Sequence, residues 1–176
     1  MTGPCRGPAV VRAVGRSARR TARLALTGRL ARPATLVGSR LAVDDGSTST
    51  VFRETAVRGY RPDDPVLLVV RFRLRWIGRA RWAHAVFRRT CLVNTPLFAG
   101  FPGFVTKLWL TDPATGVYRG LYEWDGAAAA EAYATTLARV LALVVVRGSV
   151  GHVVVPGVGR NPVLEGLPMP AAEERD

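Results

Sequence analysis

The chain has 176 residues, 48% of them hydrophobic, which is enough for one packed domain with appendages. No stretch approaches the ~20 consecutive apolar residues of a membrane-spanning helix, and two cysteines are too few for a disulfide framework. The net charge of +12 comes mostly from residues 1–40, which hold nine arginines and no acidic residue. We therefore expect a cytoplasmic protein whose basic character belongs to its N-terminal segment.

The chain divides into four parts by composition. Residues 1–40 carry Gly, Pro, Ala and Arg without a sustained helical stripe, which predicts a mostly disordered segment. Such a basic arm could bind nucleic acid nonspecifically, or it could be a tail without function. Residues 41–62 predict an extra strand or an arm, because Thr and Val are frequent there. A folded domain is expected at 63–156, followed by a flexible Pro-rich tail at 157–176.

Hydrophobic periodicity in the domain predicts an order of strand, helix, strand, strand, helix, strand, at residues 66–76, 80–93, 104–110, 117–124, 127–144 and 149–155. This is the βαββαβ order of ferredoxin-like domains, an α+β fold with a four-stranded antiparallel sheet and both helices on one face. The other face is also apolar, and a domain of this size cannot leave it in water. We therefore expect a homodimer in which two sheets face each other. Asp125 is placed to cap the second helix.

The predicted hairpin carries a candidate site. Lys107 and Trp109 share one strand face, and Tyr118 and Tyr122 share a face of the neighbouring strand. If these faces coincide, they form an aromatic pocket with a cation that stabilises a bound anion. The alternative is that Trp109 and Tyr122 fill the interior or an interface, which would favour a protein without catalysis.

Other charged residues could reach the same space. Arg71 and Arg73 could bind a carboxylate or an enolate from the adjacent strand, unless Glu123 pairs with one of them. His152 on the last strand could accept a proton, or it could be a partly buried histidine hydrogen-bonded to backbone. His84 is expected near the surface of the first helix.

Several site types have no signature in the sequence. The two histidines are far apart and no carboxylates cluster with them, so no metal site is expected. Phosphate loops, dinucleotide fingerprints and nucleophile elbows are also missing from the sequence. We expect no cofactor, although haem binding through a single histidine stays open.

The segment 66–155 resembles the YdhR-type monooxygenases of the antibiotic-biosynthesis monooxygenase superfamily. Its matching residues are Pro102, Gly103, Lys107, Trp109, Gly120, Tyr122, Ala130 and Tyr133. The resemblance implies a dimeric α/β barrel with an internal cavity. It also implies cofactor-independent oxidation, by molecular oxygen, of a hydrophobic aromatic or polyketide-like molecule. The candidate residues are His152, Lys107 and Tyr122 for catalysis and Arg71, Arg73, Trp109 and Tyr118 for substrate binding.

The resemblance leaves open whether the protein is an enzyme. The superfamily also holds haem-degrading members and proteins with no proven activity, and one fold carries many functions. A ligand-binding or structural homodimer of the same fold is therefore the alternative. Nucleic-acid contact through the basic N-terminal arm is a further one.

Overall fold

The computed structural model describes residues 7–75, 95, 98–141 and 145–172. The expected helix at 80–93, with His84, lies outside the described residues. The elements are α1 (Gly7–Leu26), β1 (Leu30–Ala31), β2 (Arg40–Ala42), β3 (Thr48–Val57), β4 (Pro65–Arg73), β5 (Phe104–Asp112), β6 (Val117–Asp125), α3 (Ala127–Leu141), β7 (Gly151–Pro156) and α4 (Asn161–Leu164).

The strands form one antiparallel sheet in the order β1-β3-β5-β6-β4-β7, with β2 paired to the outer side of β3. Its central part, β5-β6-β4-β7, has the neighbour relationships of a ferredoxin-like sheet. The predicted α+β fold class is therefore confirmed. The segment 41–62 was expected to form an extra strand or an arm, and in the structure it contains strand β3. This strand pairs with β5, at the edge of the sheet that the four predicted strands would leave open.

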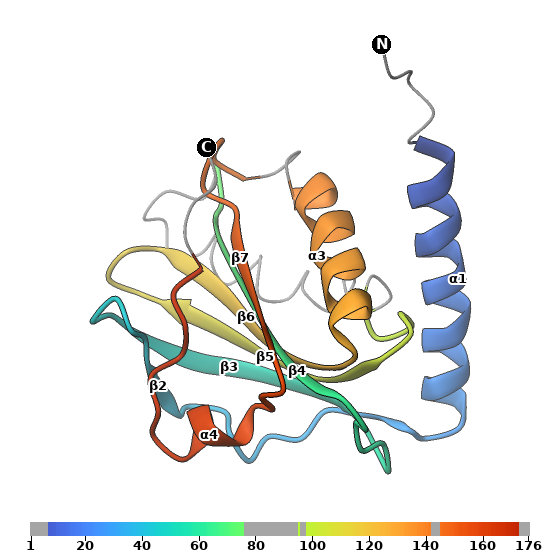
Figure 1. Ribbon diagram of the computed structural model, residues 1–176, viewed down its shortest axis with the longest axis horizontal. Helices are drawn as coiled ribbons and strands as arrows, with labels where there is room; N and C mark the ends of the chain where they lie inside the picture. Colours follow the sequence, from blue (N-terminus) through green and yellow to red (C-terminus); the bar gives the residue numbers. More distant parts are fainter. Residues whose placement is uncertain (1–6, 76–94, 96–97, 142–144, 173–176) are drawn as a thin grey trace.

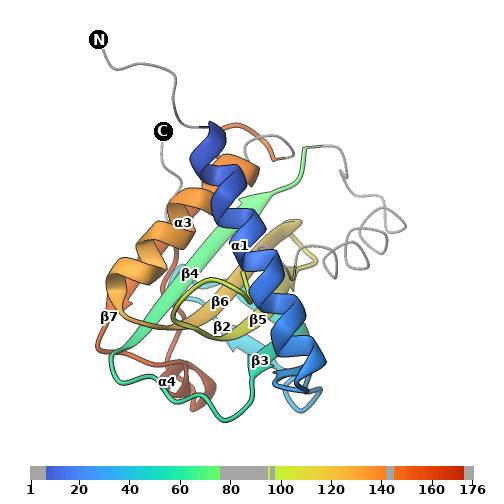
Figure 2. The ribbon, with the colours of Figure 1, turned by 90° about the vertical axis from the view of Figure 1, so that its right-hand side faces the viewer.

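One face of the sheet is covered by α3 and α1, which lie side by side (Figures 1 and 2). Ala130 and Tyr133 of α3 are buried against the even-numbered β4 residues Val66, Leu68 and Val70. Aromatic side chains dominate this first face, and eleven ring pairs among its described residues and their neighbours have centroids no more than 6.5 Å apart. We call it the helix-covered face.

Helix α1 stands where the sequence predicted mostly disorder. Ala, Leu and Arg are strong helix formers, and Ser17, Thr21 and Leu24 recur at helical spacing on the side that meets the domain. Ser17 lies so close to Gly100 that any side chain at residue 100 would collide with its backbone. Hydrophobic periodicity missed this contact because two of the three inward residues are small and polar.

The second face of the sheet is covered by the chain itself. Leu67 and Val69 of β4 are buried under Leu41, Val43, Val163, Met169 and Ala172. The Met169 amide donates to the Ala42 carbonyl at 2.8 Å, so the C-terminal segment runs beside β2. The segment 157–176 was expected to be a flexible tail, but its residues 158–172 pack here because they include apolar side chains that bury this face.

This cover changes the argument for a dimer. The expectation of two facing sheets rested on an apolar face left open to water. In the described part of the chain that face is closed by the segments around β2 and α4, on the side away from α1 and α3 (Figure 1). A homodimer thus stays a prediction, but an apolar sheet face exposed to water no longer supports it.

The Pro-Gly turn joins the two ends of the β5–β6 hairpin. Gly103 has φ of 81°, and a Cβ there would lie 2.5 Å from the Asp125 carbonyl oxygen. The Asp125 amide donates to the Gly103 carbonyl at 2.8 Å.

The Asp125 carboxylate was expected to cap α3, but it accepts from the Tyr60 hydroxyl and from the amides of Asp63 and Asp64. These bonds hold the β3–β4 turn, and they keep the pKa of Asp125 below its ordinary value, the Asp64 amide contributing most.

Candidate functional site

Lys107 is a buried cation surrounded by aromatic rings. Its side chain projects from the middle of β5 onto the helix-covered face, and the residue is 4% exposed. Nζ lies 3.1 Å from the centre of the Trp109 ring, 4.3 Å from that of Phe98 and 4.6 Å from that of Tyr122. Aromatic faces carry negative potential, so they stabilise an ammonium group where water is scarce. The face of β5 that carries Lys107 and Trp109 therefore coincides with the face of β6 that carries Tyr122. We call Lys107, Phe98, Trp109 and Tyr122 the lysine cage.

Pairing between β5 and β6 brings the cage together. Lys107 lies directly opposite Tyr122, and Trp109 lies opposite Gly120. Gly120 leaves room for the Tyr122 ring, because a Cβ at residue 120 would stand 2.5 Å from its Cε2 atom. The Tyr122 hydroxyl lies 3.1 Å from that of Tyr133 on α3. Burial raises the pKa of Tyr133, so its hydroxyl stays protonated at neutral pH.

The cage also contains an unused donor. The Trp109 indole nitrogen is buried and has no hydrogen-bond partner among the described residues. An unpaired buried N–H costs free energy, and a ligand oxygen would relieve that cost. A cation, stacking surface and a free N–H together suit a flat ligand that carries an oxyanion.

Arg71 and Arg73 lie on the opposite side of the sheet from the lysine cage. In β4 the even-numbered residues join the helix-covered face, whereas Leu67 and Val69 belong to the second face. Strand residues two apart share a face, so Arg71 and Arg73 follow Val69. The expectation that they reach the space around Lys107 is therefore not met.

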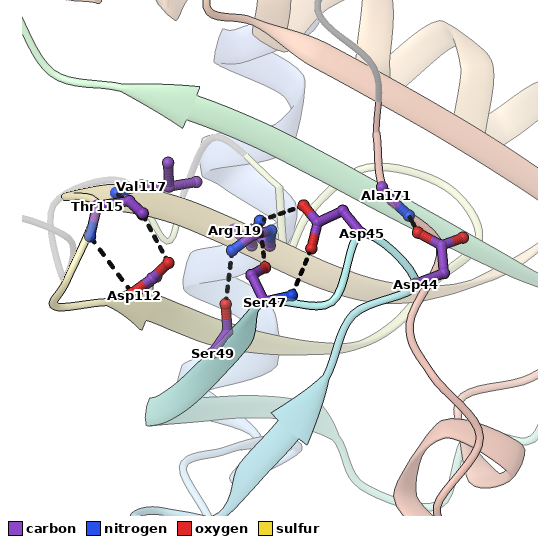
Figure 3. Close-up of polar contacts among 9 residues, drawn as sticks. All are labelled: Asp44, Asp45, Ser47, Ser49, Asp112, Thr115, Val117, Arg119 and Ala171. Carbon is purple, nitrogen blue, oxygen red and sulfur yellow. Dashed lines mark hydrogen bonds and ion pairs between the residues drawn. The ribbon is translucent and has the colours of Figure 1, made fainter.

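On that second face a buried arginine holds the turn between β2 and β3. Arg119 is 3% exposed and donates to Ser49 at 2.8 Å, Ser47 at 3.1 Å and Asp45 at 3.2 Å (Figure 3). Burial lowers the pKa of Arg119, and the Ser47 hydroxyl is the main cause that lowers the pKa of Asp45. Arg71 is close enough to contribute electrostatically to both. The cluster fastens the chain that covers this face.

His152 lies on the helix-covered face, but far from Lys107. Residues His152, Val70, Gly120 and Trp109 lie opposite one another on neighbouring strands. Three strand spacings therefore separate the Cα of His152 from that of Trp109, a distance of about 14 Å. The His152 Nε2 lies 3.3 Å from the carboxylate of Glu131 on α3, and the Glu131 side chain is half exposed. The structure therefore pairs His152 with α3 and not with the other two catalytic candidates.

Tyr118 and Glu123 have structural partners. Tyr118 is buried, stacks on Phe72 with centroids 5.9 Å apart and meets Phe52 edge-on. The Glu123 carboxylate accepts from the Arg160 amide at 3.3 Å. It therefore pairs with residues 158–172, which we call the C-terminal cover, and not with Arg71 or Arg73. Neither residue is part of the lysine cage.

Two residues of the site were not singled out as site residues from the sequence. Phe98 closes the cage from the turn before β5, and no strand or helix pattern surrounds it. Tyr133 was named among the residues that match the family resemblance, and the tertiary structure pairs it with Tyr122. Within the described ranges, no three His, Cys, Asp or Glu side chains gather where they could hold a metal ion. No helix there is long and apolar enough to cross a membrane.

Two solved structures are similar to this chain. The first is an uncharacterized ferredoxin-fold protein related to antibiotic biosynthesis monooxygenases, from Listeria monocytogenes 4b F2365. It shares 12% identity, with a TM-score of 0.47, over 64% of this chain and 66% of its own. The second is an anthrone oxidase-like protein with 17% identity and a TM-score of 0.42, over 64% of this chain and 54% of its own.

These likenesses are distant, and the chain matches less than two thirds of the length of either structure. A scan against protein-family models finds no match, and neither does a search of curated proteins. The first neighbour is described as a ferredoxin-fold protein related to antibiotic biosynthesis monooxygenases, and the second as anthrone oxidase-like. The narrower resemblance to YdhR-type proteins stays a prediction.

Proposed function

We propose that this protein binds an electron-rich aromatic or polyketide-like molecule, as a phenolate or enolate, beside Lys107, and oxidises it with molecular oxygen. The observation that carries the proposal is the ammonium group of Lys107, buried among Phe98, Trp109 and Tyr122. A fixed cation at a site of low dielectric favours the deprotonated form of a bound phenol or enol.

The oxidation needs no external reductant. An activated CH2 group and one O2 become a carbonyl group and one water, and the substrate supplies all the electrons. In this scheme Lys107 stabilises the substrate anion, the Trp109 N–H donates to its oxygen, and the Tyr122 ring orients its plane. His152 is too distant to act at the same atom, so it has no part in this step.

The alternative is a structural or ligand-binding protein of the same fold that has no catalytic activity. Trp109 and Tyr122 are 5% and 2% exposed and pack against other rings, which favours an interior filled by side chains. Binding and catalysis therefore need separate measurements.

The test is oxygen uptake with a panel of hydroquinones and anthrones, together with quenching of Trp fluorescence by anthraquinone as a non-oxidisable probe. Lys107→Met should abolish uptake and weaken binding, with an unchanged circular dichroism spectrum. His152→Ala is the matched control and should retain uptake. Binding without uptake would establish the non-catalytic alternative, and neither binding nor uptake would overturn the proposal.

A further inference from the structure

Helix α1 presents a row of arginines to solvent. Arg12, Arg16, Arg19 and Arg23 are exposed and lie at i, i+4, i+7 and i+11, which places them along one side of the helix. None forms an ion pair with another described residue. We call these four residues the arginine stripe.

The side of the helix opposite the arginine stripe packs against the domain. Ser17 and Thr21 are 1% and 6% exposed, and Leu24 packs against the core of the helix-covered face. Figure 2 shows α1 in front of the sheet, with its outer side free of other elements. The arginines therefore project outward from an anchored scaffold.

Charge decides the class of partner. The first 40 residues contain no acidic side chain that could neutralise the stripe. The stripe is about 16 Å long at 1.5 Å per residue. Over that length a nucleic-acid duplex presents about five phosphates on each strand. Four arginines thus face a comparable number of phosphates.

The other residues of α1 favour a duplex over other polyanions. Interfacial membrane helices expose Trp, Phe and Leu beside their basic residues. Among the side chains described on α1, Leu26 at the last turn is the single large apolar one that is exposed. The helix has no aromatic residue, and single-strand binders stack bases on aromatic rings.

We propose that α1 is a docking surface for double-stranded nucleic acid, bound through its phosphates and without base recognition. Arginine forks pair well with phosphate oxygens. This binding is independent of the lysine cage, so either proposal can fail alone.

The test is fluorescence anisotropy of the full chain with a labelled 24-base-pair duplex across salt concentrations. Four phosphate contacts should lower the affinity by about two orders of magnitude between 50 and 200 mM salt. Arg16→Gln with Arg23→Gln should weaken binding roughly tenfold or more at 50 mM salt and flatten the salt slope by about 1.8. Arg40→Gln with Arg147→Gln removes the same charge from exposed sites outside α1 and should change binding little.

Point substitutions are used because deletion of residues 1–40 would also remove β1 and part of β2. Equal effects of the two double variants would contradict the assignment to α1. Absence of duplex binding at 50 mM salt would overturn the proposal. Tighter binding to a labelled single strand, or to phosphatidylglycerol vesicles, would overturn it in favour of that partner.

Discussion

The ring of Tyr122 lies over Gly120, two residues earlier in the same strand. A Cβ atom at residue 120 would stand 2.5 Å from the Tyr122 Cε2 atom and 3.0 Å from its hydroxyl oxygen. The Gly-x-Tyr pattern in β6 therefore has a steric reason. Glycine makes room for a ring that must also reach Lys107 and Tyr133.

Replacement of Gly120 by alanine should displace that ring. The extra methyl group collides with a buried side chain, which typically costs about 1–3 kcal/mol of unfolding free energy. Chemical denaturation measures the change. Gly15→Ala is the control, because nothing lies within 4 Å of its added Cβ and alanine favours a helix. Equal stability of Gly120→Ala and the parent would contradict the packing.

The Tyr122–Tyr133 hydroxyl contact should appear as a coupling energy. Tyr122→Phe leaves the buried Tyr133 hydroxyl without its described partner, which should cost about 1–3 kcal/mol. Once that partner is gone, Tyr133→Phe should cost less. A double-mutant cycle from urea unfolding is expected to give about 0.5–1.5 kcal/mol of coupling. Strict additivity would mean that the two hydroxyls do not interact.

The C-terminal cover can be tested with two neighbouring residues. Met169 is fully buried and Leu167 is 61% exposed. Met169→Ala should destabilise the protein by about 2–5 kcal/mol, because it opens a cavity over the sheet. Leu167→Ala should stay within about 0.5 kcal/mol of the parent. A similar small effect of both substitutions in thermal unfolding would show that residues 158–172 do not cover the sheet in solution.

Removal of the cover should expose the second face. A chain ending at residue 156 loses Val163, Met169 and Ala172 from above Leu67 and Val69. We expect it to self-associate, since a large apolar face in water seeks a partner. Light scattering of this truncation, beside a chain ending at residue 172, measures the change in mass. An unchanged mass and melting temperature would contradict the covering role.

Acid should selectively weaken the turn that Arg119 holds. The pKa of Asp45 in the folded state lies below its ordinary value, chiefly because of the Ser47 side chain and also because the Ser47 amide donates to the carboxylate at 2.8 Å. Its stabilising effect is therefore present above the unfolded pKa near ~3.9 and is lost as pH falls through the folded value. Ser47→Ala should cost at most about 1 kcal/mol at pH 7, since Asp45 is partly exposed.

That cost should shrink below about pH 4. Unfolding of the parent and of Ser47→Ala across pH 2.5–7 tests this, with Ser39→Ala as the control. A cost that does not vary with pH would exclude the carboxylate as its source.

Local patterns were sufficient to predict most of the domain. Alternation in residues 66–76 and 104–124 predicted β4, β5 and β6, and the observed strand ends differ from the predicted ones by no more than three residues. Strands can be predicted in this way because successive side chains point to opposite faces of the sheet and so alternate in polarity. The same period predicted that Lys107 shares a face with Trp109 and that Tyr122 shares one with Tyr118, whereas the structure shows that the face of Lys107 coincides with that of Tyr122. Helix α1 was missed because its inward residues, Ser17 and Thr21, are small and polar.

The sequence by itself determined the order of the four strands β4, β5, β6 and β7 and which residues of one strand share a face. Only the tertiary structure decided what covers those faces. Met169 and Ala172 reach the second face through contacts with β2, more than 120 residues earlier, and local periodicity carries no information on such pairs. Likewise Phe98 and Tyr133 come to the lysine cage from a turn and from a helix. Long-range packing assembles both the cover of the second face and the lysine cage. The hydrophobic effect is non-directional, so an apolar face can be buried by a segment from any part of the chain.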